Sequence, residues 1–215
     1  MMKHSLIYIC LFNFIFGFGF ELSLGGAYNL NQDISITRDS HADIDFDASF
    51  DTHGLESPQY YSLRFKYQIK KKNMELEFIH HKLYVEENLP DQVEKFEVSD
   101  GYNLLLINLV NTLSENINYR LGVGTVITHP DIMIDGQTNY IKGGGLIPKI
   151  WTDGYHWGGI SSQASVFYNY GIKDNLSMNI ETKLIYASAS VPVVGGSFIL
   201  PNLSIHFLVG ISFGK

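Results

Sequence analysis

The chain has 215 residues, a formal net charge of −7, and 45% hydrophobic, 13% aromatic and 17% charged residues. This length fits one domain of any class or two small domains. The acidic balance argues against nucleic acid as a partner. Beyond the extreme N-terminus, no apolar run approaches the roughly 18 to 20 residues that a membrane-spanning helix needs, so a helical membrane protein is not expected.

Residues 1–19 have the layout of a secretory signal peptide. Lys3 gives a basic start, residues 6–18 are apolar, and Gly17 and Gly19 take the −3 and −1 positions of a cut after Gly19. The alternative is an N-terminal membrane anchor, but the apolar run is short. Cys10, the only cysteine, lies inside this segment, so the mature chain 20–215 would contain no disulfide.

The segment 58–85 shows the clearest strand pattern. Its first arm alternates Leu63, Phe65, Tyr67 and Ile69 with Ser62, Arg64, Lys66 and Gln68, and its second arm alternates Met74, Leu76 and Phe78 with Glu75 and Glu77. Period-2 alternation predicts an antiparallel hairpin with one apolar and one charged face. A turn centred on Lys71–Lys72 would place Lys66 opposite Glu77 and Gln68 opposite Glu75.

Eight strand-like runs follow the signal segment, at about 20–30, 58–70, 73–86, 97–112, 116–128, 157–171, 175–188 and 199–213. They are longer than the usual five or six residues of soluble strands and suit the roughly 9–11 residues of a tilted membrane strand. Short connections at 70–73, 113–116 and 173–175 alternate with longer ones at 31–57, 87–95, 129–156 and 191–196. This alternation is typical of outer-membrane barrels, which have short periplasmic turns and long external loops.

The polar faces of these runs collect four cations and three anions, namely Arg64, Lys66, Arg120, Lys183, Glu75, Glu77 and Glu181. Such a set suits a filled, salt-bridged lumen, with the apolar faces turned to lipid. The faces of run 97–112 cannot be assigned, because Leu104–Ile107 is continuously apolar and Asn103 and Asn108 have opposite parity, which a bulge would explain.

Aromatic residues lie near the strand ends and predict two girdles at the membrane interfaces. The outer set is Tyr60, Tyr61, Tyr84, Tyr102, Trp151, Tyr155 and Trp157, and the inner set is Tyr67, Tyr119, Tyr168, Tyr170 and Phe213.

Together, the signal peptide, the eight runs, the alternating connections and the aromatic-rich last strand LSIHFLVGISFGK resemble the small eight-stranded outer-membrane barrels of Gram-negative bacteria. That group includes the OmpA transmembrane domain, PagP and PagL. The resemblance covers residues 20–215 and is one of architecture. It implies an all-β, eight-stranded antiparallel transmembrane β-barrel in the cell outer membrane. Its expected partners are outer-membrane lipids, lipopolysaccharide and the barrel assembly machinery, although Gly214 and Lys215 follow the usual terminal aromatic position.

Eight strands enclose an interior that side chains fill, so the leading hypothesis is a non-pore surface protein, structural or ligand-binding. The alternative is a lipid A or phospholipid acyl-modifying enzyme at the outer rim. Its candidate catalytic residues are His80, His81, Ser99, Asp100 and His129, which could supply a base, a nucleophile and an orienting carboxylate. A soluble secreted barrel of the lipocalin sort is a third possibility, and interfacial or lumen hydrogen bonding is the simpler role for the histidines.

The segment ELEFIHH at 75–81 is faintly similar to the active-site strand of the PagL lipid A deacylases. The resemblance implies a catalytic Ser two positions after the His, but Lys82 and Leu83 stand at the two positions where it would fall. The deacylase reading therefore lacks its nucleophile on this strand.

Neither a cofactor nor a metal is predicted. Asp43, Asp45 and Asp47 alternate in the first long loop and could hold a hard cation such as calcium, but the glycine and distal Glu of a calcium loop are absent. A solvated strand above the membrane is the favoured interpretation. Gly143–Gly145 opens no predicted helix, so it indicates a flexible turn rather than a phosphate loop.

Overall fold

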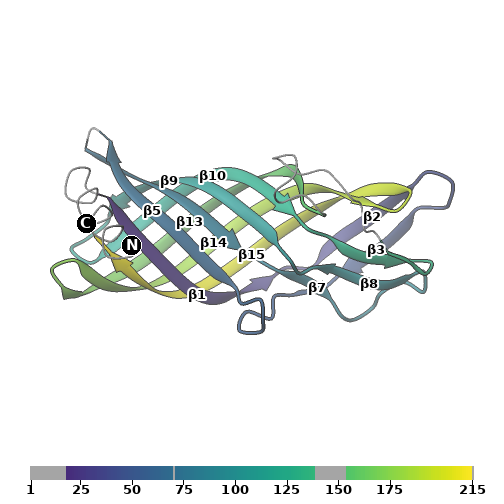
Figure 1. Ribbon diagram of the computed structural model, residues 1–215, viewed down its shortest axis with the longest axis horizontal. Helices are drawn as coiled ribbons and strands as arrows, with labels where there is room; N and C mark the ends of the chain where they lie inside the picture. The colour runs from purple at the N-terminus through teal and green to yellow at the C-terminus, as the bar shows by residue number, and fades with distance from the viewer. Residues whose placement is uncertain (1–17, 70, 139–153, 215) are drawn as a thin grey trace, which may run out of the picture.

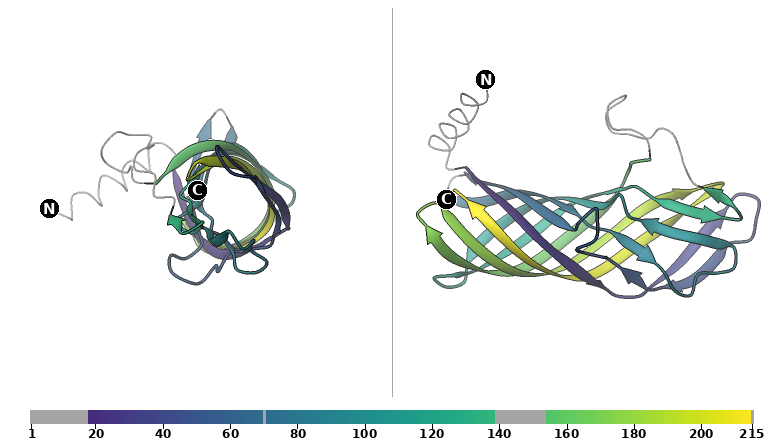
Figure 2. Two further views of the ribbon diagram at one scale, coloured as in Figure 1. Left: turned by 90° about the vertical axis from the view of Figure 1, so that its right-hand side faces the viewer. Right: turned by 60° about the horizontal axis from the view of Figure 1, so that its bottom comes forward.

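The computed structural model describes residues 18–69, 71–138 and 154–214. Within these ranges, no helix is long and apolar enough to span a bilayer. Eight antiparallel strands form a closed barrel in which β1 pairs with both β5 and β15, so that Phe20 lies beside Phe213 (Figure 1; Figure 2, left). The barrel strands are β1 (Gly19–Asn29), β5 (Tyr61–Ile69), β6 (Lys72–His80), β9 (Tyr102–Thr112), β10 (Ile117–Thr128), β13 (His156–Lys173), β14 (Leu176–Val193) and β15 (Gly196–Phe213).

All eight predicted runs correspond to these strands, and the short turns are confirmed at one end of the barrel. Ile69 pairs with Lys72 and Lys173 pairs with Leu176, which leaves two-residue connections. The predicted hairpin register was wrong by two residues, because Arg64 rather than Lys66 lies opposite Glu77. Since strand side chains alternate with period 2, a shift of two residues leaves every side chain on its predicted face.

Strands β13, β14 and β15 have 18 residues each, so each is about 60 Å long at ~3.3 Å per residue. A tilted strand needs only about 9–11 residues to cross a bilayer. The outer halves of these strands therefore extend beyond the membrane. The predicted loop 191–196 is the tight turn of this extension, because Val193 pairs directly with Gly196.

The other long connections, which were predicted to be loops, also contain strands. A hairpin of β2 (Gln32–Arg38) and β3 (Ile44–Ala48) joins the tip of β15, where Arg38 pairs with Gly196. A separate sheet has the order β12-β11-β8-β7-β4 and closes the opposite side of the external half (Figure 2, right). Its strands are β12 (Gln137–Thr138), β11 (Asp131–Ile134), β8 (Val93–Val98), β7 (Leu83–Val85) and β4 (Phe50–Asp51).

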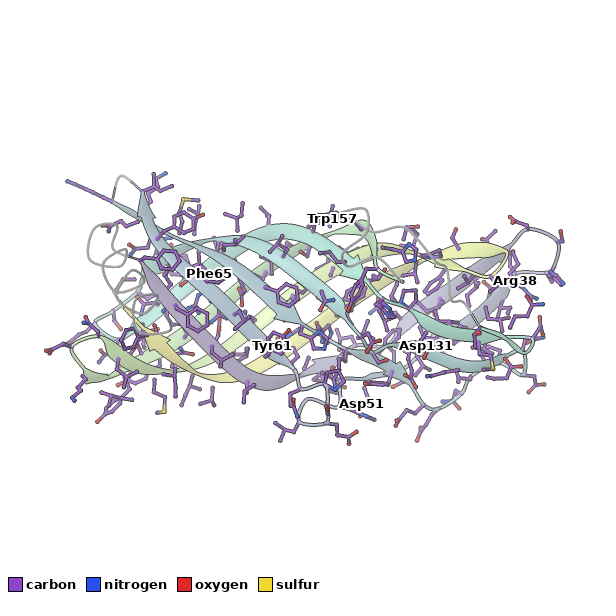
Figure 3. The ribbon with its side chains drawn as sticks, in the orientation of Figure 1. Arg38, Asp51, Tyr61, Phe65, Asp131 and Trp157 are labelled. Atoms are coloured by element: carbon purple, nitrogen blue, oxygen red, sulfur yellow. The ribbon has the colours of Figure 1, made fainter. Side chains whose placement is uncertain are left out.

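The apolar face of the barrel wall changes from the outside to the inside along the length of the barrel. In the half near the short turns, the exposed face is apolar and the lumen is polar. In the external half, the interior is an apolar core that includes Ile34, Ile36, Phe96, Ile185, Val191, Phe198 and Leu200, whereas Ser190 and Ser197 face out. The first half matches a bilayer and the second matches water. Figure 3 shows Phe65 in the lipid-facing half and Arg38 at the external tip.

The faces of run 97–112 follow from the continuous pairing of β9 with β6 and β10. Asn108 is fully buried in the lumen, whereas Asn103 points to the opposite side of the wall, where it contacts His80 and is also buried. The irregularity that the sequence suggested for this run occurs elsewhere, between Val126 and Ile127 in the pairing of β10 with β13.

The inner aromatic girdle is confirmed in its most exposed members, because Tyr168, Tyr170 and Phe213 all face out. The outer girdle is only partly correct. Tyr61 and Trp157 lie on the outer face, but Tyr60 and Tyr102 are fully buried inside the barrel. Parity explains this correction, because consecutive residues of a strand point to opposite faces. Trp151 lies outside the described residues.

Candidate functional site: the barrel lumen and the outer rim

Eight ionisable side chains fill the lumen of the membrane half, and we call them the charge network. They are Glu21, Arg64, Lys66, Glu75, Glu77, Arg120, Glu181 and Lys183. Seven were predicted from alternation. Glu21 was missed, although it alternates with Phe20 and Leu22 in the same way. It supplies the fourth anion, so the four cations of the network are balanced.

Two arginines hold the network together. Arg120 contacts Glu75 at 2.6 Å and Glu181 at 2.9 Å, and its guanidinium lies 3.5 Å from the ring centroid of Phe167. Arg64 contacts Glu77 at 2.7 Å and also pairs with Glu21 and Glu181. Both arginine side chains are completely buried. Buried charges are stable only when they are paired, so this part of the lumen is a packed polar core.

Neutral side chains complete the hydrogen bonds around Glu77. Ser62 donates to Glu77 at 2.6 Å, Asn108 at 2.8 Å and Gln163 at 2.6 Å, and Lys183 forms an ion pair with the same carboxylate. Each Glu77 oxygen has at least two donors, with Ser62 and Lys183 at Oε1 and Asn108 and Gln163 at Oε2, so this buried carboxylate is fully satisfied without solvent. The lumen is therefore closed by interactions that are costly to open.

A second buried polar group lies between the charge network and the external apolar core, and we call it the relay. Its members are Tyr60, His206, Ser204, Asn202, Asn29 and Thr52. The Tyr60 hydroxyl lies 2.6 Å from His206 Nδ1, and Ser204 Oγ lies 2.8 Å from His206 Nε2. This Ser–His pair was not among the predicted site residues, although both residues alternate inward in the segment LSIHF.

The hydrogen-bond directions in the relay follow from one another. Asn202 donates to Asn29 at 3.0 Å, so its carbonyl oxygen is free to accept the Ser204 hydroxyl proton at 2.9 Å. Because that proton is used, His206 Nε2 must donate to Ser204, and His206 Nδ1 accepts from Tyr60. His206 is thus a hydrogen-bond donor to Ser204 and does not act as its base. The relay ends in the external segment, where Asn29 donates to Thr52 at 2.9 Å.

The two adjacent histidines of the predicted catalytic set lie on opposite faces of the wall. His81 is fully buried in the lumen, where its ring centroid is 4.9 Å from that of His206. His80 points to the other side of the strand, where it is also buried, its Nδ1 lies 2.8 Å from Asn103 Oδ1 and its ring stacks on Tyr61 at 5.2 Å. One chemical step at a single site cannot use both rings.

The other predicted residues gather in part. His129 Nδ1 lies 3.5 Å from Asp100 Oδ2, and the His129 ring centroid is 4.6 Å from that of Tyr155, whose hydroxyl donates to the Asp100 carbonyl. Ser99 donates its hydroxyl to Glu97 at 3.1 Å. The structure therefore brings a His and a carboxylate together, while the hydroxyl of the predicted set bonds to a different partner.

A shallow groove of about 680 Å³ lies on the lipid-facing wall. Small side chains, including Ala164 and Thr182, form it between larger ones such as Tyr119 and Leu184, and none of the five predicted catalytic residues lines it. Across the described ranges, no group of three or more His, Cys, Asp or Glu could hold a metal ion, and Asp43, Asp45 and Asp47 are exposed on or beside β3. The charge network and the relay fill the interior with packed polar side chains.

A closed eight-stranded ring with an apolar exterior and a charged lumen defines a small outer-membrane β-barrel. Comparison with solved structures agrees on the fold. The outer-membrane protein OprG from Pseudomonas aeruginosa is similar with a TM-score of 0.51 and 12% identity, over 93% of this chain and 96% of that chain. The prediction of an all-β, eight-stranded antiparallel barrel is confirmed.

Two further solved structures are similar at lower scores. The outer-membrane protein AlkL, solved in lipid bilayers, has a TM-score of 0.47 and 11% identity, over 93% of this chain and 90% of that chain. Neisserial surface protein A has a TM-score of 0.45 and 11% identity, over 93% and 97%. No protein-family model matches the sequence, and no curated protein sequence matches it.

Proposed function

We propose that this protein is a non-conducting outer-membrane barrel that displays a rigid, acidic external domain for a structural or ligand-binding role at the cell surface. The single observation that carries the proposal is the charge network, because four balanced ion-paired cations fill the membrane half of the lumen. The relay and the external apolar core lie above it and add two further layers of packed side chains.

The external half has a defined surface charge. In residues 30–60, 81–101 and 129–138, fifteen Asp or Glu residues accompany only three Lys or Arg residues. A field of this sign attracts cationic partners and repels anionic polymers. A ligand of this surface is therefore expected to be basic, or to be bridged by divalent cations. The apolar core beneath the surface keeps it rigid, so such a ligand would meet a preformed face.

Residues 1–19 belong to the proposal as a signal peptide that directs export, although residues 1–17 lie outside the described residues. The barrel assembly machinery would then insert the chain, with the aromatic-rich β15 as its recognition strand. Lipopolysaccharide would surround the lipid-facing wall in the outer leaflet. The apolar exposed face of β15, which includes Phe207, Val209 and Ile211, supports this lipid contact.

The proposal is tested by conductance across planar lipid bilayers that contain the purified, folded protein. We expect no steady ohmic current from the wild-type chain. The double variant Arg64→Ala and Arg120→Ala, which removes two lumen cations, should show current if it still inserts. A stable wild-type current of uniform step size would contradict the sealed-barrel proposal and favour a channel.

A further inference from the structure

The chain returns from the external sheet to β5 through a loop that lies beside the barrel. We call residues 53–58 the lateral loop. It follows β4 and precedes β5, and it projects from the wall near mid-length (Figure 1). Asp51 and Tyr61, which flank the loop, lie in this middle zone (Figure 3). The whole connection 31–57 was predicted to be a long external loop.

Several hydrogen bonds hold the lateral loop in one shape. Lys82 is fully buried and donates from Nζ to the carbonyl oxygens of His53 at 2.8 Å and Glu56 at 3.0 Å. Burial lowers the pKa of Lys82, and the nearby Glu56 and Asp51 carboxylates act in the opposite direction. The His53 ring stacks on Tyr84 at 4.7 Å and lies 3.1 Å from Glu56. The loop is therefore clamped.

Glycines fix the loop against the barrel wall. A Cβ added at Gly54 would lie 2.4 Å from the carbonyl oxygen of Gly25 and 3.0 Å from Cα of Gly26, so no larger residue fits. At this level the pairing of β1 with β5 has ended, because Leu24 and Tyr61 form its last pair. The lateral loop thus covers the seam between the two strands at the upper edge of the lipid-facing wall.

This arrangement leaves the Leu55 side chain exposed. It is 79% exposed, the highest value among the large apolar side chains that the structure describes. The nearby lipid-facing side of β1 exposes Leu24 at 49% and Tyr28 at 65%. A clamped loop has no freedom to fold Leu55 back into the protein. An apolar side chain held beside the lipid-facing wall is expected to enter the bilayer interface.

We propose that the lateral loop is a membrane foot, in which Leu55 inserts into the outer leaflet just below the lipid headgroups. The exposed carboxylate of Glu56 stays among the headgroups, so only Leu55 reaches the acyl region. This contact would set the depth of the barrel and the height of its external domain. The inference rests on the proposed outer-membrane function and adds a lipid contact from a connection outside the barrel strands.

Fluorescence quenching in liposomes tests the proposal. The variant Leu55→Trp is made with Trp151→Phe and Trp157→Phe, and it is reconstituted into vesicles with and without dibrominated phosphatidylcholine. We expect blue-shifted emission that the brominated lipid largely quenches. Ile199→Trp is the matched control, because Ile199 is 58% exposed in the external half of β15, where the lipid should not quench it.

A second control separates this inference from the proposed function. Val209→Trp reports on the lipid-facing wall, because Val209 is 55% exposed in the membrane half of β15. Quenching at Val209→Trp without quenching at Leu55→Trp would overturn the membrane foot alone. Absence of quenching at both positions would overturn the membrane location itself. Because the predicted mature chain has no cysteine, Leu55→Cys labelled with an environment-sensitive dye provides an independent readout that must show the same apolar surroundings.

Discussion

Leu184 and Ile185 are consecutive apolar residues of β14 that face different environments. Leu184 is 51% exposed on the lipid-facing wall, whereas Ile185 is completely buried and belongs to the external core. The two residues mark the level at which the barrel exchanges an apolar exterior for an apolar interior. Below Leu184 the inward positions are Lys183 and Glu181, and above Ile185 they are Ala187 and Ala189.

Because of this reversal, truncation to alanine should lower the free energy of unfolding by different amounts at these two adjacent positions. Ile185→Ala leaves a cavity in a packed core and should lower the free energy of unfolding by about 2–5 kcal/mol. Leu184→Ala should cost clearly less, because lipid chains can fill the vacated space. Equilibrium urea unfolding in liposomes measures both. Equal losses would show that the external core is not packed as described.

Replacing one arginine of the charge network with an uncharged residue should lower the free energy of unfolding strongly. Arg120→Met removes the partner of Glu75 and Glu181 while it keeps most of the side-chain volume. Breaking one member of a buried ion pair typically costs about 3–5 kcal/mol, because the remaining charge is left uncompensated. The same unfolding measurement applies.

Lys72→Met serves as the control for Arg120→Met. Lys72 is exposed beside a short turn, and no ion pair of its side chain is described. Its substitution should change stability by less than about 0.5 kcal/mol, as surface changes usually do. A small loss at Arg120 as well would mean that solvent reaches the network and screens it.

The membrane half of the fold was predictable because its strands alternate outward apolar residues with inward polar residues. In β5 and β6, strict alternation identified the inward charges, and the two-residue register error did not matter. The external half was missed because its strands turn their apolar residues inward. The predicted run 175–188 stops five residues before the end of β14, in the external half where apolar Ala187, Ala189 and Val191 take the buried inward positions. The continuation of β14 to Val193 became visible only in the paired strands.

The candidate site was harder to predict than the fold. His80 and His81 were grouped because they are adjacent, but adjacency in a strand separates side chains onto two faces. The relay depends on contacts between residues as distant in sequence as Tyr60 and His206, and no local pattern encodes them. Glu21, by contrast, could have been predicted, because it alternates with the apolar Phe20 and Leu22. In the structure it lies directly opposite Arg64.

The β2–β3 hairpin predicts a stabilising substitution. Asp33 and Asp47 are direct cross-strand partners on its exposed face, so two like charges oppose each other. Asp33→Lys would replace this repulsion with an ion pair, and cross-strand pairs contribute about 0.2–1 kcal/mol. Hydrogen exchange at the amides of β2 and β3 should slow.

Asp43→Lys is the matched control for Asp33→Lys, because it makes the same charge change just outside the hairpin ladder. Slower exchange in the Asp33 variant alone would identify the cross-strand pair as the cause. Equal slowing in both variants would point to the net charge of the external surface. Faster exchange in the Asp33 variant would contradict the repulsion between Asp33 and Asp47.

The enzyme alternative predicts a chemical change that the structure does not favour. An acyl-modifying site needs a hydroxyl whose proton a histidine can take, but Ser99 donates to Glu97 and Ser204 donates to Asn202. We therefore expect unchanged lipid A when the protein is expressed in a Gram-negative host and the lipid is analysed by mass spectrometry. A host that expresses a known lipid A deacylase gives the positive control. Gain or loss of one acyl chain, abolished by His81→Ala or Ser99→Ala, would overturn this expectation. It would require the wall to rearrange, because Ser204 and His81 are completely buried in the described structure.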